Sequence, residues 1–319
     1  MRIGILTSGG DCPGINATIR GVCKTAINYY GMEVIGIHSG FQGLLTKDVE
    51  SFTDKSLSGL LNLGGTMLGT SREKPFKKGG VVSDVDKPAL ILRNIREMGL
   101  DCVVCIGGNG TQKTAAKFAA MGVNIVSVPK TIDNDIWGTD ISFGFDSAVS
   151  IATDAIDRLH STASSHKRVM VIEVMGHKVG HVTLHAGIAG GADIILLPEI
   201  PYDIKAITKV IDGRTKAGKP FTILAVAEGA ISKEDAKLKK KEYKEKLAKR
   251  KYPSIAYELA EQIQKETDKE VRITVPGHTQ RGGSPCAYDR VFATRVGAKA
   301  AELILNEEYG YMVAMRNGE

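Results

Sequence analysis

The sequence predicts an α/β protein of two lobes built on mostly parallel sheets. Short apolar segments typical of strands alternate with amphipathic helix segments along the whole chain of 319 residues. This alternation is typical of parallel sheets with helices on both faces. Glycine-rich or polar turns follow several of the strand segments, and ligands of open α/β proteins bind at the carboxyl ends of such strands. The sequence therefore predicts a binding site at one edge of a sheet.

Composition indicates an ordinary soluble protein, with 43% hydrophobic and 24% charged residues. No apolar run approaches the roughly 18 residues that span a bilayer. The sequence opens directly into a strand pattern without a signal peptide, so we expect a cytoplasmic protein and no membrane. The five cysteines are scattered. Cys102 and Cys105 form a CxxC within an apolar strand and are interpreted as small core residues, because no further metal ligands accompany them.

The net charge of +6 comes from one stretch of the chain. Residues 233–251 hold ten basic and four acidic side chains, so the formal charges of the rest of the chain sum to zero. A single lysine- and glutamate-rich stretch is typical of a solvated surface helix. Nucleic-acid binding needs a basic face with interleaved aromatic residues, and Tyr243 alone does not provide one. We therefore expect no nucleic-acid partner.

In the first lobe, three glycine-rich or polar turns each follow the carboxyl end of a strand. Strands are expected at residues 2–7, 33–37, 101–106 and 124–128, with helices at 15–26 and 114–121. Glycine turns follow the first and third strands at 8–14 and 107–111, and a polar heptapeptide follows the fourth. Backbone amides in such turns stabilise anions. The first turn is not GxGxxG, so a dinucleotide fingerprint is not indicated. Three turns at one rim predict a binding site.

The heptapeptide Pro129 to Asp135, PKTIDND, concentrates reactive groups in one turn. It holds two carboxylates, a carboxamide, a hydroxyl and an ammonium. An Asx-rich turn without a chemical role is an equally good interpretation of these residues alone. Upstream, Arg72 stands in a glycine-rich segment with Lys74, Lys77 and Lys78. An arginine there suits phosphate oxygens, while the lysines are also typical of a solvated surface loop.

The second lobe is expected to begin after a crossing at residues 142–146. Strands are predicted at 169–174, 194–197, 222–227 and 271–275, and helices at 149–159 and 204–216, with a final helix over 292–303. Polar residues again follow the strands, among them Glu228. The segment PGHTQRGGSP gathers His278, Gln280 and Arg281 among its glycines.

Eight motifs resemble the 6-phosphofructokinase family in order and spacing. They are TSGGDCPGINA, GGTMLGTSR, IGGNGT, PKTIDND, SSHKRVMVIEVMGHKVG, GIAGGAD, the Glu228 turn and PGHTQRGGSP. The resemblance implies two Rossmann-like lobes with the active site between them: residues 1–144 plus 280–319 as the donor lobe, and 145–279 as the fructose 6-phosphate lobe. It also implies a homotetramer that uses Mg2+ and ATP to phosphorylate the 1-hydroxyl of fructose 6-phosphate in glycolysis, releasing ADP.

The resemblance assigns roles to individual residues. Asp133 would be the general base that accepts the proton of the sugar hydroxyl, with Thr131 beside it and Asp135 supporting the site and its metal. Arg72 and Arg168 complete the catalytic set. The residues implied for the donor are Gly10, Arg72, Gly107, Gly108, Asn109, Gly110, Thr111 and Lys130. Those implied for the sugar phosphate are Thr131, Asp133, Arg168, Met175, Gly176, His177, Glu228, Arg272, His278 and Arg281, with Arg168 and Arg272 serving a neighbouring subunit.

Two positions give opposite indications about the donor. In the family, a glycine at the place of Gly110 is typical of ATP users, whereas an aspartate excludes the nucleotide in pyrophosphate users. Lys130 is typical of pyrophosphate users. We weight Gly110 more, because steric exclusion is absolute, and keep pyrophosphate as the alternative donor. Asn109 stands where the family more often has a metal-binding aspartate, and its amide oxygen can still ligate magnesium.

Two further alternatives have other functions. A kinase of the NAD or lipid type would share the IGGNGT turn, but PGHTQRGGSP and PKTIDND disfavour it. A non-catalytic sugar-phosphate sensor would need no base, so Asp133 disfavours that interpretation.

Overall fold

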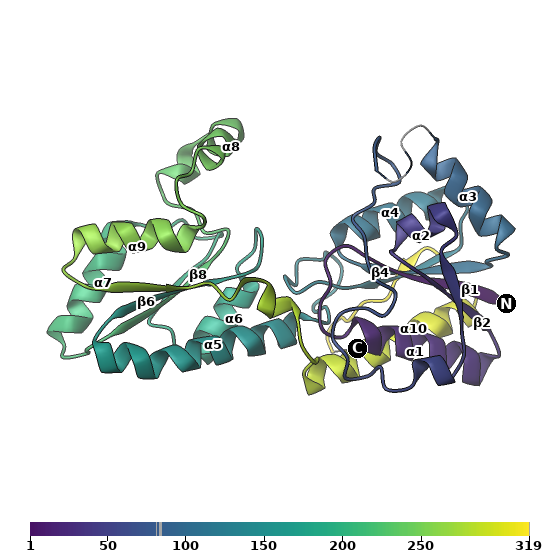
Figure 1. The fold of residues 1–319 in the computed structure, drawn as a ribbon, viewed down its shortest axis with the longest axis horizontal. Helices are drawn as coiled ribbons and strands as arrows, with labels where there is room; N and C mark the ends of the chain where they lie inside the picture. Colours follow the sequence, from purple (N-terminus) through teal and green to yellow (C-terminus); the bar gives the residue numbers. More distant parts are fainter. Residues whose placement is uncertain (81, 83–84, 319) are drawn as a thin grey trace. The chain divides into compact units, whose positions relative to one another are not determined.

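The computed structural model describes residues 1–80, 82 and 85–318, which form two compact units (Figure 1). The first unit comprises Met1–Ser147 and Arg281–Glu319, and the second comprises Ala148–Gln280. The units thus divide at 147 instead of the predicted 144, and at 281 instead of 280. The expected α/β class with mostly parallel sheets is confirmed. Among the described residues, no helix is long and apolar enough to span a bilayer.

The first unit is built on a six-stranded sheet in the order β10-β5-β4-β1-β2-β3. Its strands are β1 (Arg2–Ser8), β2 (Glu33–Ile37), β3 (Val49–Phe52), β4 (Cys102–Gly107), β5 (Ile125–Pro129) and β10 (Tyr311–Met312). All neighbouring strands are parallel except β2 and β3, which are antiparallel. The sequence analysis predicted neither β3 nor β10. Cys102 and Cys105 are buried in β4, as expected of core residues.

Helices cover both faces of this sheet (Figure 1). On one face, α1 (Ile15–Tyr30) and α10 (Ala287–Leu305) lie side by side. Their close approach requires glycine, because a Cβ on Gly21 would lie 2.7 Å from the carbonyl oxygen of Thr294. On the other face, α2 (Phe41–Thr46), α3 (Lys87–Glu97) and α4 (Asn109–Ala120) bury Phe41, Ile91 and Phe118 in one apolar cluster.

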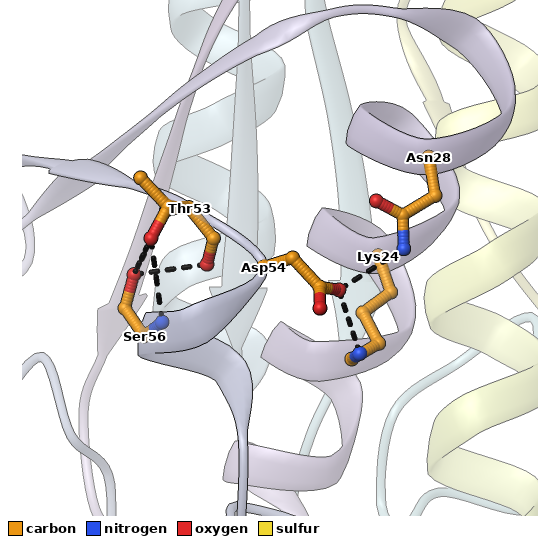
Figure 2. A network of polar contacts seen from close by, with 5 residues as sticks. All are labelled: Lys24, Asn28, Thr53, Asp54 and Ser56. Carbon is orange, nitrogen blue, oxygen red and sulfur yellow. Dashed lines mark hydrogen bonds and ion pairs between the residues drawn. The ribbon is translucent and has the colours of Figure 1, made fainter.

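A polar network joins α1 to the turn after β3 (Figure 2). Lys24 and Asn28 of α1 both donate to Oδ1 of Asp54, at 2.7 and 3.0 Å. These hydrogen bonds, with Lys24 contributing most, hold the pKa of Asp54 below its ordinary value. Asp54 precedes the short 3-10 helix η1 (Lys55–Leu57), whose turn is closed by Thr53 and Ser56. The turn that follows the edge strand β3 is thereby held against α1.

The second unit is a four-stranded, fully parallel sheet in the order β7-β8-β6-β9. Its strands are β6 (Val169–Val174), β7 (Ile194–Leu196), β8 (Thr222–Ala227) and β9 (Val271–Thr274). The helices α7 (Ile204–Lys216) and α9 (Ile255–Glu266) bury apolar side chains in one cluster against it. The helices α5 (Phe145–His166) and α6 (His181–Ala189) lie along the other face (Figure 1).

Two predictions about local structure are wrong. The lysine-rich stretch is not one helix, because Leu238 and Lys239 are extended and separate η2 (Asp235–Lys237) from α8 (Lys240–Ala248). Three residues of the predicted glycine turn 107–111 are helical, since α4 begins at Asn109. The backbone amides of Asn109, Gly110 and Thr111 therefore belong to the first turn of a helix, where they have no partners within the helix.

A buried carboxylate secures the entry into α5. Asp289 accepts hydrogen bonds from the backbone nitrogens of Gly144 (3.0 Å) and Ser147 (2.8 Å) and from Oγ of Ser147 (2.6 Å). Burial raises the pKa of Asp289, whereas these donors favour its ionised form. One carboxylate thus satisfies three donors that have no access to water.

Asp289→Ala is expected to lower the free energy of unfolding by about 3 kcal/mol, because buried donors would lose their acceptor. Asp154→Ala is the matched control, since Asp154 makes an exposed ion pair with Arg158 on α5 itself. That change should cost at most about 0.5 kcal/mol. Urea denaturation of both variants measures the difference, and equal losses would contradict the role given to Asp289.

Candidate active site

The carboxyl ends of three strands lie level with one another in the first unit. Ser8 at the end of β1 is in register with Gly107 at the end of β4, and Gly107 is in register with Pro129 at the end of β5. The segments that follow these residues are the three turns singled out in the sequence. The parallel register therefore brings them to one edge of the sheet, as predicted.

The first turn of α4 holds this edge together. Oγ1 of Thr111 donates to the carbonyl oxygen of Ser8 (3.3 Å), and Nε2 of Gln112 donates to those of Gly107 (2.9 Å) and Val128 (3.1 Å). Gly107 must be glycine, because a Cβ would lie 2.3 Å from Oγ1 of Thr111. One helix start thus contacts all three strands.

The glycine turn after β1 encloses a buried ammonium. Nζ of Lys130 donates to the carbonyl oxygen of Gly10, and the Lys130 residue is only 4% exposed. Burial lowers the pKa of Lys130, with a further lowering from Arg281. Arg281 itself donates to the carbonyl oxygen of Asp11 at 3.2 Å. Two predicted site residues, Lys130 and Arg281, therefore bring basic side chains to this turn.

The heptapeptide is a rigid turn. The backbone nitrogen of Asp133 donates to Oγ1 of Thr131 at 3.0 Å. Asn134 has a φ of 51°, and its side-chain oxygen accepts from the backbone nitrogen of Ser142 at 2.8 Å. Oγ of Ser142 in turn donates to the carbonyl oxygen of Thr131. The backbone on both sides of Asp133 is thus fixed while its side chain stays half-buried at the edge of the sheet.

Two oxygen-bearing side chains from different turns lie together at this edge. Nδ2 of Asn109 donates to Oδ2 of Asp135 at 2.8 Å. Among the residues that the structure describes, no cluster of three or more His, Cys, Asp or Glu side chains could hold a metal by itself. One carboxylate with one amide oxygen suits Mg2+, which usually completes its coordination with water and substrate phosphates.

Gly110 faces open space. A Cβ placed on Gly110 would have no heavy atom within 4 Å, and its φ lies outside the left-handed region. A side chain could therefore be added here without disturbing the fold. Arg72, the other predicted donor contact, is exposed on the segment that follows β2 and β3 in the chain.

In the second unit, the carboxylate of Glu228 holds the turn that follows β6. Oε1 of Glu228 accepts from the backbone nitrogens of Gly176 (3.3 Å) and His177 (2.6 Å). The backbone nitrogen of Met175 donates to Oε1 of Gln280 at 3.2 Å. Gly229 must be glycine, since a Cβ would lie 2.2 Å from the carbonyl oxygen of His177. The ends of β6 and β8 are thus tied together.

A pair of arginines lies at the other end of this sheet. Arg168 forms a bidentate ion pair with Glu270, at 2.6 and 3.1 Å, and Arg272 contacts the same carboxylate. Because two guanidinium groups share one carboxylate, the cluster keeps a net positive charge. His278 is exposed in the 3-10 helix η3 (Gly277–Arg281).

The structure therefore assembles the predicted residues into separate groups. The first unit contains Gly10, Arg72, Gly107, Gly108, Asn109, Gly110, Thr111, Lys130, Thr131, Asp133, Asp135 and Arg281; the second contains Arg168, Met175, Gly176, His177, Glu228, Arg272 and His278. Sequence reasoning did not find the partners Gln112 and Glu270. Gln112 stands one turn into a helix whose start was placed too late, and nothing in the local pattern distinguishes Glu270 from a surface glutamate.

Comparison with known proteins identifies the family of this chain. The family model described as Phosphofructokinase matches residues 2–304. The chain belongs to the phosphofructokinase family.

Curated members of the family are similar over the whole chain. The ATP-dependent 6-phosphofructokinase 3 of Bacteroides thetaiotaomicron is 73% identical over 319 residues, which cover 100% of this chain and 90% of that protein. The ATP-dependent 6-phosphofructokinase of Spirochaeta thermophila is 55% identical over 320 residues, covering 99% of this chain and 87% of that protein.

The fold matches a solved member of the phosphofructokinase family. The crystal structure of Pichia pastoris phosphofructokinase in the T-state superposes with a TM-score of 0.83 at 33% identity. The match covers 95% of this chain and 32% of the yeast chain, so this chain spans about a third of that protein.

Proposed function

We propose that this protein is an ATP-dependent 6-phosphofructokinase, which transfers a phosphoryl group from ATP to the 1-hydroxyl of fructose 6-phosphate. The observation that carries the proposal is the convergence of the glycine turn, the start of α4 and the Asp133 turn at the level ends of β1, β4 and β5. The two curated relatives named above carry this activity in their names. Fructose 6-phosphate and ATP are accordingly the substrates.

The donor's phosphates would bind at the glycine turn and the start of α4. The unpaired backbone amides at a helix start, together with the positive end of the helix dipole, stabilise phosphate without a side chain. Gly10, Gly107, Gly108 and Thr111 would supply backbone contacts, and Arg72 and Lys130 would supply positive charge. The open space at Gly110 would leave room for the nucleotide.

Asp133 would act as the general base. A primary hydroxyl is a weak nucleophile, so a carboxylate within hydrogen-bond reach assists as the O–H proton leaves. Most of the barrier in phosphoryl transfer is lowered by positioning and by charge stabilisation. The fixed turn around Asp133, with Thr131 bound to its backbone nitrogen, supplies the positioning. Arg72 and Arg168 would balance the charge of the transferred group.

Asp135 and Asn109 would hold Mg2+, which when bound neutralises charge on the donor's phosphates. Their oxygen atoms suit this ion, and they lie together. Because the asparagine contributes no charge, Asp135 would carry most of the protein's share of metal affinity.

Fructose 6-phosphate would bind the second unit together with Arg281, which belongs to the first unit. Met175, Gly176, His177 and Glu228 would contact the sugar. The side chains that would bind the phosphate group of the sugar are Arg168, Arg272, His278 and Arg281. Arg168 and Arg272 would serve a neighbouring subunit of a homotetramer. The net positive charge left by two arginines on Glu270 supports this assignment.

Glycolysis is the setting of this reaction, and we place the enzyme in the cytoplasm.

Pyrophosphate is the second candidate donor, and Lys130 is the observation that favours it. A buried ammonium bound to the carbonyl oxygen of Gly10 could serve a smaller donor of higher charge density. We favour ATP, because charge added by a lysine does not exclude a nucleotide, whereas the space beside Gly110 admits one.

Asp133→Asn should lower kcat by about 100- to 10,000-fold, because the amide cannot accept the proton. Binding of fructose 6-phosphate, measured by calorimetry, should be nearly unchanged. Asp140→Asn is the control, since Asp140 is an exposed residue of the same connecting loop. It should keep the wild-type rate in a coupled assay for fructose 1,6-bisphosphate. An Asp133→Asn enzyme with wild-type turnover would remove Asp133 from the chemistry.

Gly110→Asp should abolish the use of ATP while leaving the fold intact, because the new carboxylate enters space that is open in the protein and needed by the nucleotide. Gly110→Ala is the matched control: it adds only the Cβ and should keep most of the activity. Thermal unfolding checks both variants. Wild-type ATP kinetics in a folded Gly110→Asp enzyme would refute the steric argument.

A further inference from the structure

A buried ion pair closes the segment that carries Arg72. Nζ of Lys87 lies 2.5 Å from Oε1 of Glu73, and the two side chains are only 3% and 5% exposed. Lys87 also donates to the carbonyl oxygen of Gly79. The other carboxylate oxygen, Oε2, lies so close to Gly80 that a Cβ there would be 2.3 Å from it. The pair therefore ties residue 73 to residues 79 and 80.

The buried ammonium group of Lys87 needs a partner where it lies, at the start of α3. Lys87 is the first residue of α3, after the N-cap Asp86, whose side chain accepts from the backbone nitrogen of Ala89. An ammonium at the positive end of a helix dipole is unfavourable, and burying it adds a desolvation cost. A buried lysine at this place is tolerated because Glu73 and the carbonyl of Gly79 compensate it. The groups that stabilise the Lys87 ammonium therefore come from the loop of residues 73–79 and not from α3.

Both neighbours of Arg72 are anchored. On one side, the carbonyl oxygen of Ser71 accepts from the backbone nitrogen of Gly9 at 3.0 Å, and Oγ of Ser71 donates to the carbonyl oxygen of Ser39 at 2.6 Å. On the other side stands Glu73 in its ion pair. The backbone of Arg72 is therefore held against the glycine turn that follows β1.

The segment beyond Glu73 is also pinned from the inside. Pro75 is buried, and the ring of Phe76 packs on Phe118 of α4 with centroids 4.9 Å apart. Arg72 and Lys74, by contrast, are exposed. Together with the exposed Lys77 and Lys78 they line an open pocket of about 610 Å³. The inward residues hold the loop, and the outward residues present four cations.

We infer that the Glu73–Lys87 ion pair is a positioning device for Arg72 and the adjacent lysines at the donor end of the site. Neither residue would touch the substrates. The inference rests on the proposed function, in which Arg72 contacts the phosphates of ATP. Lys87 contacts both Glu73 and the carbonyl oxygen of Gly79, and so fixes both ends of the segment 73–79. The basic side chains of this segment would therefore contact the phosphates of ATP in one fixed arrangement. Misplacing a catalytic group by about 1 Å can cost about 100-fold in rate.

Three variants test the inference. Glu73→Gln and Lys87→Met each break the pair. The double variant Glu73→Met/Lys87→Met leaves no buried charge, so its thermal midpoint should stay near the wild-type value. In all three, KM for ATP should rise about tenfold or more and kcat should fall, while KM for fructose 6-phosphate stays within about twofold. A purely structural role would move the thermal midpoint and both KM values together.

Arg93→Met is the matched control. Arg93 lies on the same helix α3, and its ion pair with Glu97 is exposed, with 66% of the arginine side chain accessible. This variant should leave both KM values and kcat unchanged.

Calorimetric titration with ATP in the absence of the sugar separates the two proposals. Wild-type protein that binds ATP in this titration but forms no fructose 1,6-bisphosphate once fructose 6-phosphate and Mg2+ are added contradicts the proposed function, while a tenfold weaker ATP affinity in the double variant still supports the positioning role. ATP affinity and KM within twofold of wild type in the double variant would overturn that role, as would equal losses for both substrates.

Discussion

The register of three parallel strands is the constraint on which the site depends. Ser8, Gly107 and Pro129 end β1, β4 and β5 at one level, so the turns that follow begin side by side. The sheet is apolar and buried here, and a slip by one residue would turn each strand's side chains to the other face. The start of α4 then locks the level ends through Thr111 and Gln112. A rigid edge is what phosphoryl transfer requires, because most of its catalysis is positioning.

Charge at this edge is placed mainly by backbone contacts. Lys130 and Arg281 both donate to carbonyl oxygens of the glycine turn, and Arg72 stands between two anchored residues. In the second unit, Glu228 orients the turn after β6 through backbone nitrogens, while Glu270 holds two arginines. Carbonyl oxygens and carboxylates thus fix the positions of the basic side chains. These positions are important because the substrates of the family are anionic.

The sequence was sufficient for the inner strands of both sheets and for the place of the three segments that follow them, because buried parallel strands are continuous apolar runs with glycine or polar residues at their ends. It did not predict β3 and β10 at the edges of the first sheet. It was insufficient where tertiary contacts decide. The helical start at Asn109 was missed, since Asn-Gly is a turn signal until the strand ends position it. The break at Leu238 and Lys239 was missed because lysine-rich segments have high helix propensity throughout. The Glu73–Lys87 pair joins a loop to a helix, and no periodic pattern marks it.

The central claim is that the open space at Gly110 decides the donor despite Lys130. The most direct measurement is formation of fructose 1,6-bisphosphate from fructose 6-phosphate and Mg2+, with ATP and pyrophosphate compared at matched concentrations. Our account predicts a strong preference for ATP. A strong preference for pyrophosphate would mean that the buried lysine decides, and it would contradict the account.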